Sequence, residues 1–199
     1  VSRDLVGKFV DQIGIYVLNS DVVFKDVSDS ILAFISAPSL KKETKWQLGS
    51  VSETQKFWLE SSASAISPNA ITLLDITQNT PRINLELSEK FLPQELNLHV
   101  RGGLSFEKGC FPGQEIIARV KYRGNLKRNL RVLESPGTLT KPPKTGDPVT
   151  DTNGKKVGTI LQVASMSETR TIVQSVLDVS ISDFCYCNDN SDELVLIDS

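Results

Sequence analysis

The residues best suited to chemistry lie between Lys108 and Glu115, in the sequence Lys-Gly-Cys-Phe-Pro-Gly-Gln-Glu. Cys110 stands here between two glycines, with Lys108 two residues before it. Thiolate is the reactive form of cysteine, and a nearby cation or helix N-terminus favours it. Because residues 114–122 read as a short helix, both influences are expected at Cys110. We therefore predict a functional thiol, with a buried cysteine in a turn as the structural alternative.

A strip of cations follows this thiol. Within thirteen residues there are six cations and no acid, namely Arg119, Lys121, Arg123, Lys127, Arg128 and Arg131. Such clustering suits an anionic partner, either nucleic-acid phosphates or the polyglutamate tail of a folate. Tyr122 adds an aromatic face on which a base can stack. A solvated helix end explains the same charges without a ligand.

The remaining cysteines and the single histidine give weaker evidence of a functional site. Cys185 and Cys187, two residues apart, are expected on one face of a strand, but a zinc or cluster site needs further ligands. His99 has no evident partner, and we expect a structural role for it. Three cysteines without a disulfide-framework spacing favour a reducing, cytoplasmic setting.

The composition of the 199 residues, with 39% hydrophobic and 23% charged side chains, is that of a globular protein of one or two domains. A net charge of −2 gives no bulk attraction to nucleic acid. No apolar run approaches the roughly 20 residues that cross a bilayer, so no membrane partner is expected.

Periodicity predicts the elements that must position these residues. Leu5, Phe9 and Ile13 share one face of a helix. β-Branched and aromatic residues predict strands over residues 14–18, 22–27, 31–35 and 70–75. Good helix formers predict helices over residues 53–65 and 85–93, the second ending at Pro93.

The chain changes character beyond Gly124. Short strands are predicted at residues 130–133, 148–150, 157–163, 171–176 and 194–197, and Asn153-Gly154 is a strong hairpin signal. We predict an α+β fold in which residues 1–126 form an α+β region that carries the thiol. Residues 127–199 are expected to form a small antiparallel β-barrel.

Three stretches carry a resemblance to a known family. They are Phe91-Leu92-Pro93-Gln94-Glu95-Leu96-Asn97-Leu98, the run from Gly102 to Glu115, and the run from Ala118 to Arg128. Together they resemble the YgfZ family, whose signature is K-G-C-[FY]-x-G-Q-E. The resemblance implies a fold like that of the T-protein, the aminomethyltransferase of the glycine cleavage system. It implies that the α+β region is a partial T-protein-like domain.

The resemblance also implies a function. YgfZ proteins are folate-binding and linked to tRNA modification through the assembly or repair of iron–sulfur clusters. Cys110 is then the functional thiol and Lys108 its electrostatic neighbour. A tetrahydrofolate derivative is the implied ligand, iron–sulfur enzymes or assembly proteins are the implied partners, and tRNA is an indirect one. The expected cofactor-binding residues are Arg119, Lys121, Arg123 and Lys127, with Gln114 and Glu115.

Two further interpretations stay open. One is a folate-dependent one-carbon transferase like the T-protein, and the other is an RNA-binding module that uses the cationic strip. No reaction with a defined substrate and product follows from the sequence. Family members carry a further N-terminal stretch that contributes to the folate pocket, and without it an open sheet edge is expected. A homodimer through that edge is the predicted assembly.

Overall fold

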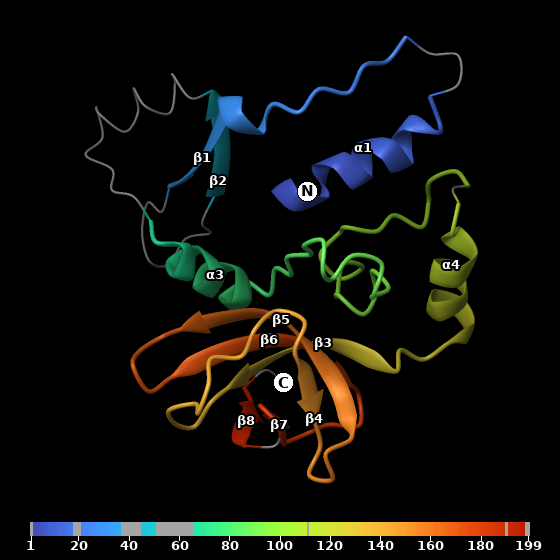
Figure 1. Cartoon of the computed structure of the whole chain (residues 1–199). Helices are drawn as coiled ribbons and strands as arrows, with labels where there is room; N and C mark the ends of the chain where they lie inside the picture. Colours follow the sequence, from blue (N-terminus) through green and yellow to red (C-terminus); the bar gives the residue numbers. More distant parts are fainter. Residues whose placement is uncertain are drawn as a thin grey trace. The chain divides into compact units, whose positions relative to one another are not determined.

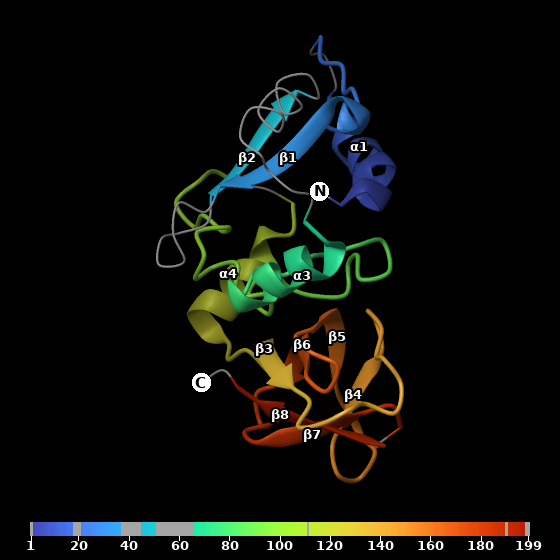
Figure 2. The same cartoon turned by 90° about the vertical axis from the view of Figure 1, so that its left-hand side faces the viewer.

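The computed structural model describes residues 2–17, 21–36, 45–50, 66–110, 112–189 and 191–197. The chain divides into two compact units, Val1–Ile66 and Ser67–Ser199. Figures 1 and 2 show the elements of each unit in two views. The second unit contains both the thiol motif and the barrel, so it holds every residue of the predicted site.

The first unit contains short helices and one pair of strands. A 3-10 turn, η1 (Arg3–Leu5), leads into helix α1 (Val6–Gly14), as the spacing of Leu5, Phe9 and Ile13 predicted. A second turn, η2 (Ser28–Ser30), precedes β1 (Ile31–Ser36), which pairs antiparallel with β2 (Lys45–Ser50). The strand predicted at 31–35 is confirmed. The homodimer through a sheet edge stays a prediction.

Two predicted strands in this unit are wrong. Residues 14–17 continue and close α1, and residues 21–27 have no regular structure. β-Branched residues favour a strand only where a neighbouring strand completes the hydrogen-bond ladder, and among the described residues no strand pairs with these segments. The helix predicted over residues 53–65 lies outside the described residues.

Helix α3 (Pro68–Thr77) replaces the strand predicted over residues 70–75. The Ser67 hydroxyl accepts a hydrogen bond from the Ala70 amide at 3.1 Å, and Pro68 occupies the first turn. A capping serine and a proline at this position both favour a helix start, and they outweigh the β-propensity of Ile71 and Thr72.

The segment after α3 folds as a series of turns, so the helix predicted over residues 85–93 is also wrong. Glu89 and Asn97 adopt positive φ angles of 63° and 56°, which a continuous helix does not allow. Leu87 and Leu96 of this segment are nonetheless fully or almost fully buried. The turns therefore pack firmly on the rest of the second unit.

A closed antiparallel barrel of six strands forms the C-terminal part of the second unit (Figures 1 and 2). Its order is β3-β6-β5-β4-β7-β8, and pairing of β3 with β8 closes it. The strands are β3 (Arg128–Glu134), β4 (Pro148–Thr150), β5 (Lys156–Ser165), β6 (Thr171–Asp178), β7 (Phe184–Cys187) and β8 (Asp192–Leu196). The predicted barrel and the Asn153-Gly154 hairpin are thus confirmed, and the fold is α+β.

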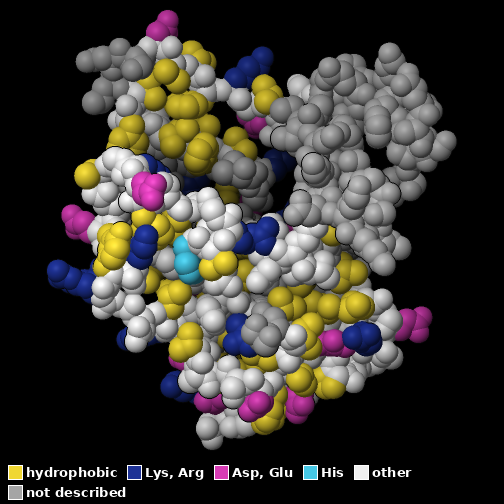
Figure 3. All heavy atoms as spheres, turned by 180° about the vertical axis from the view of Figure 1, so that it is seen from behind, with side chains coloured by type: hydrophobic (Ala, Val, Ile, Leu, Met, Phe, Trp, Pro, Cys, Tyr) yellow, Lys and Arg dark blue, Asp and Glu magenta, His cyan; other side chains and the backbone are white. Residues whose placement is uncertain are grey.

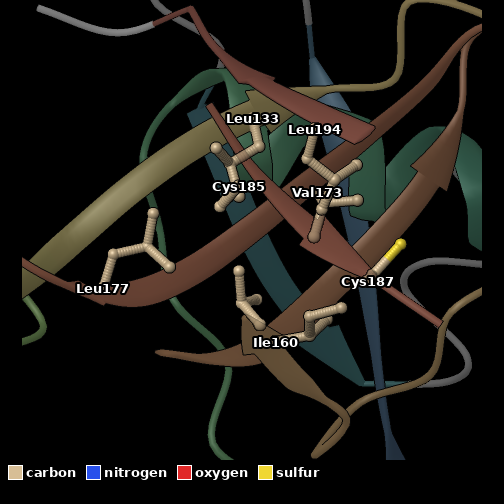
Figure 4. Packing of buried hydrophobic residues seen from close by; sticks show 8 residues of the cluster. Leu133, Ile160, Val173, Leu177, Cys185, Cys187 and Leu194 are labelled. Atoms are coloured by element: carbon tan, nitrogen blue, oxygen red, sulfur yellow. The ribbon is translucent and has the colours of Figure 1, made fainter. Parts of the chain in front are cut away.

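The barrel interior is apolar, as Figure 4 shows. Its side chains come from every strand and are Leu133, Val149, Ile160, Val173, Leu177, Cys185, Cys187 and Leu194. Cys185 and Cys187 both point inward from β7, which confirms that the two thiols share one strand face. Both cysteine side chains are part of the hydrophobic core of the barrel.

Strand β6 is buried on both faces. Val173 and Leu177 face the barrel interior, whereas Ile172, Gln174 and Val176 face outward and are covered. Leu87 and Leu96 of the turn segment pack against Val176, and α3 packs against Ile172 through Ile76. A second apolar layer therefore fixes the segment between α3 and Leu98 on the outside of the barrel.

Buried amides hold the start of this segment on the barrel. Gln162 donates from Nε2 to the Thr80 carbonyl oxygen and to Gln174 Oε1, both at 2.8 Å. Gln174 in turn donates to Asn79 Oδ1 at 3.3 Å. These bonds satisfy polar groups that the apolar layer would otherwise isolate from water.

Helix α4 (Gln114–Arg123) confirms the helix predicted after the thiol, and it leads through residues 124–127 into β3. The boundary predicted between residues 126 and 127 falls just before β3 and inside the second unit. Among the described helices, none has the length and apolar character needed to cross a membrane.

Replacing Gly158 by alanine should destabilise the second unit. A Cβ at this position in β5 would lie 2.3 Å from Leu177 Cδ2 and 2.7 Å from the Val176 carbonyl oxygen. Overpacking of this kind costs about 1–3 kcal/mol, which urea unfolding followed by circular dichroism would measure. Gly137→Ala is the control, because a Cβ there meets nothing within 4 Å. Equal losses for the two variants would contradict the packing described for β5 and β6.

Candidate functional site

The thiol motif forms an exposed loop at the start of α4. Lys108, Gly109 and Cys110 are all exposed, and Gly113 caps the helix with a φ of 84°. This positive φ favours glycine, which explains the second glycine of the motif. Cys110 lies three residues before the cap, so the expected order of cation, thiol and helix N-terminus is present. Phe111 lies outside the described residues.

The cationic strip does not form one surface. A helix has about 3.6 residues per turn, so Arg119 and Arg123, four apart, lie on the same face of α4. Both are exposed, as is Lys127 in the segment after the helix. Lys121 lies on the opposite side, and its Nζ is 3.7 Å from the centre of the Phe106 ring. The strip is therefore divided by the helix itself.

Arg128, the fifth cation of the strip, has a structural role. Its Nε and Nη2 atoms donate to Glu95 Oε1 and Oε2 at 2.9 and 3.1 Å, and the Glu95 side chain is only 8% exposed. Glu95 Oε2 also accepts a hydrogen bond from the Leu92 amide at 2.9 Å. A buried carboxylate needs such partners, so Arg128 fixes the turn segment to β3. Arg131, the last cation, is half-buried within β3.

A cavity of about 540 Å³ lies on the inward side of α4. It combines aromatic, apolar, amide and basic groups, contributed by Gln94, His99, Leu104, Phe106, Val120, Lys121, Gly124, Asn125 and Leu126. Figure 3 shows the single histidine in cyan at the surface, with lysine or arginine and hydrophobic side chains around it. This is the size range of small-molecule sites, about 300–1,000 Å³.

Gln94 has an incomplete set of hydrogen bonds in the cavity wall. The residue is 2% exposed, and its Nε2 donates to the Ile117 carbonyl oxygen at 2.7 Å. Its Oε1 is buried and has no partner. Unpaired buried acceptors are uncommon and costly, so Oε1 offers a place for a ligand's donor group.

A smaller cavity of about 70 Å³ lies beside the first. Lys108 and Gln114 of the thiol motif contribute to its wall, together with Tyr122 and Phe106. Phe106 also lines the larger cavity, so its ring is a wall common to both. This shared ring connects the motif with the larger cavity.

The structure thus brings together only part of the predicted site. Of the residues predicted to bind the cofactor, Lys121 lines the larger cavity and Gln114 the smaller one. Arg119, Arg123, Lys127 and Glu115 are exposed and are not among the residues that line either cavity. Cys110 is likewise outside both linings.

Sequence reasoning missed the polar wall of the cavity. Gln94, His99, Phe106 and Asn125 come from three segments, and Gln94 stands among leucines in a stretch that reads as a packing element. His99 was expected to be structural because it has no sequence neighbour with which to act. The available signal was that Gln94 and Phe106 lie in the stretches that carry the family resemblance.

Two curated proteins are similar to this chain. The "tRNA-modifying protein YgfZ" of Buchnera aphidicola subsp. Schizaphis graminum is 39% identical over 113 residues, covering 55% of this chain and 35% of that protein. The protein of the same name from Cronobacter sakazakii is 36% identical over 108 residues, covering 53% of this chain and 32% of that protein. The resemblance to the YgfZ family is confirmed. No family model matches the chain.

The match with YgfZ proteins has a defined extent. The chain spans about a third of the length of the curated relatives it matches. The alignments therefore establish similarity over about half of this chain. The activity and partners of a whole YgfZ protein remain matters of proposal for this chain.

The three cysteines of this YgfZ-like chain differ in accessibility. Cys110 is exposed, whereas Cys185 and Cys187 are 0% and 1% exposed. Burial raises the pKa of the Cys185 thiol to about 12, with a smaller contribution from Cys187. Burial, together with the charges of Asp192 and Asp147, raises the pKa of Cys187 to about 11. Both core thiols stay neutral in the folded protein at physiological pH, and thiols react poorly in that form.

Titration with Ellman's reagent should therefore distinguish the thiols. At pH 8 the native protein should release one equivalent of chromophore rapidly, from Cys110, and three equivalents after unfolding in guanidinium. Raising the pH to 9 should leave the core pair protected, because their raised pKa values lie above that pH. Cys110→Ala should abolish the rapid phase. Rapid release of three equivalents from the native wild-type protein would show that the barrel core is open.

Proposed function

We propose that this chain acts in iron–sulfur cluster assembly or repair linked to tRNA modification, with Cys110 as the functional thiol. The observation that carries the proposal is the difference between the cysteines. Cys110 is exposed on a glycine-flanked loop before α4, whereas the other two are sealed in the barrel core. A cysteine whose role is packing would be buried, whereas this loop exposes Cys110 to solvent.

The link to tRNA modification rests on the relatives. Both curated proteins bear the name tRNA-modifying protein YgfZ. The stretches that carry the family resemblance include the loop of Cys110 and, apart from His99, the residues that line the larger cavity. The proposal therefore assigns this link to the part of the chain where thiol and cavity lie close in sequence.

Cluster chemistry suits a single exposed thiol in a particular way. Iron–sulfur clusters are held by several cysteine thiolates, and among the described residues no group of three His, Cys, Asp or Glu side chains is placed to hold a metal. Cys110 alone would supply one ligand to a cluster that is cargo. The remaining ligands would come from the client enzyme or assembly protein, which makes the contact transient.

The cavity fits a folate by its donor set. Folates combine a flat heterocycle with hydrogen-bonding edges, an aromatic ring and carboxylates. Gln94 Oε1 would accept a hydrogen bond from the heterocycle, Phe106 offers an apolar ring, and Lys121 is a cation within the lining. When bound, a tetrahydrofolate would supply one-carbon or reducing chemistry. The chain's own residues would bind it, orient it and exclude water.

We also propose that the region before the barrel is a partial T-protein-like domain. It carries α3, the turn segment and α4, with the cavity between the turn segment and α4. The T-protein resemblance leaves a one-carbon transferase as the alternative function. That enzyme would use the same cavity, but no described contact places Cys110 in it.

Cells that lack their own YgfZ protein test the role of Cys110. Expression of the full chain should restore the activity of a radical-SAM tRNA-modifying enzyme, and Cys110→Ala should lower that restoration at least tenfold. Gly137→Ala is the matched control, since it changes an open surface position without affecting the thiol. Undiminished restoration by Cys110→Ala would overturn the proposed role of the thiol.

Ligand binding by the purified chain tests the proposed role of the larger cavity. Lys121→Met should weaken tetrahydrofolate binding by the purified chain at least tenfold in isothermal titration calorimetry, because the variant removes the cation in the lining. Lys156→Met, on the exposed start of β5, is the charge-matched control and should bind as the wild type does. Equal affinities of Lys121→Met and wild type would exclude this cavity as the folate site.

A further inference from the structure

The outward face of α4 is a surface that the larger cavity does not use, although Tyr122 at its edge also lines the smaller cavity. Arg119, Tyr122 and Arg123 lie on it together, because residues three and four apart share a helix face. Tyr122 is 69% exposed and Ile116, on the same side, is 58% exposed. Lys127 is exposed just beyond the helix. The face thus carries three exposed cations and an exposed aromatic ring, whose centre lies 5.2 Å from Lys121 Nζ.

These cations differ from three other arginines of the second unit. Arg82, Arg128 and Arg170 each form a salt bridge with a carboxylate, namely Asp75, Glu95 and Glu134. Within the described part of the chain, no salt bridge joins Arg119, Arg123 or Lys127 to an acid, although Glu115 lies one turn before Arg119. The face therefore presents positive charge that the fold leaves uncompensated.

We propose that this face binds unpaired nucleotides of RNA. Arg119, Arg123 and Lys127 would contact phosphates, for which guanidinium groups have a matching donor geometry. Tyr122 would stack on a base, and only an unpaired base presents its face to a side chain. An acidic protein segment would satisfy the cations but gives no role to the exposed ring. The choice of RNA over DNA rests on the proposed link to tRNA modification.

Direct RNA contact would place the chain's thiol beside a tRNA substrate. Cys110 and this face belong to one loop and the helix that follows it. The proposal is separate from the role of the thiol, because Cys110 precedes the helix and is not part of the face. Nor does it require the larger cavity, where the Nζ of Lys121 lies 3.7 Å from the centre of the Phe106 ring.

Fluorescence anisotropy with the full chain and a labelled, unstructured RNA of about 12 nucleotides tests the proposal. Arg119→Glu/Arg123→Glu should weaken binding at least tenfold. The control pair Lys155→Glu/Lys156→Glu makes the same change in net charge on the barrel and should stay within about twofold of wild type. Arg119→Met/Arg123→Met should reduce the slope of log affinity against log salt by about 1.4, because each phosphate contact on a single strand contributes about 0.7.

The ring is tested separately. Tyr122→Ala should weaken binding at least fivefold, whereas Tyr122→Phe keeps the stacking surface and should bind within about twofold of wild type. Cys110→Ala should bind RNA as the wild type does. If Cys110→Ala binds RNA normally but does not restore enzyme activity in cells, the lost activity is due to the thiol and not to RNA binding.

Several results would overturn the proposal. Equal losses of RNA affinity in Arg119→Glu/Arg123→Glu and in Lys155→Glu/Lys156→Glu would show that only the net charge matters. Displacement of the RNA by an equimolar poly-glutamate peptide would assign the face to an acidic protein partner. Equal affinity for single-stranded DNA of the same sequence would remove the assignment to RNA.

Discussion

Burial of β6 on both of its faces is the constraint on which the second unit depends. Val173 and Leu177 pack inside the barrel, and Ile172 and Val176 pack under α3 and the turn segment. A barrel strand with one solvated face would alternate apolar and polar residues, but here the outer face is a second core. Leu87 and Leu96 belong to that outer core, so packing on the barrel also orders the turn segment, which contributes to the larger cavity.

The site inherits its geometry from this packing through a few polar contacts. The pair between Glu95 and Arg128 ties the turn segment to the first barrel strand, and the bond from Gln94 to Ile117 ties it to α4. These contacts join the turn segment to α4 and β3, and the turn segment and α4 both contribute residues to the larger cavity. Gln94 is left with one unpaired acceptor, which is the kind of local deficit found at ligand sites.

Helix α4 separates the side chains of three proposed activities that are adjacent in sequence. Its N-terminal loop presents Cys110, its inward side presents Lys121 to the cavity, and its outward side presents Arg119 and Arg123 to solvent. One short segment therefore presents an exposed thiol, a cation in the lining of a cavity and a separate pair of exposed cations. Different side chains serve each proposed activity, so a substitution can test one of them without changing the residues of the other two.

The sequence by itself determined the elements whose signals are local. The helix after Cys110, the Asn153-Gly154 hairpin and most barrel strands follow from period, turn residues and β-propensity. The prediction was wrong where a local preference was weak: Ser67 and Pro68 start a helix over residues predicted as a strand. Residues 21–27 have no regular structure, and no strand in the described part of the chain pairs with them. The motif alone marked Cys110. Only the tertiary structure decided that Arg128 pairs with a buried carboxylate, that Gln94 and His99 line a cavity, and that Lys121 lies against the Phe106 ring. These facts depend on contacts between residues far apart in the chain, which spacing along the sequence does not record.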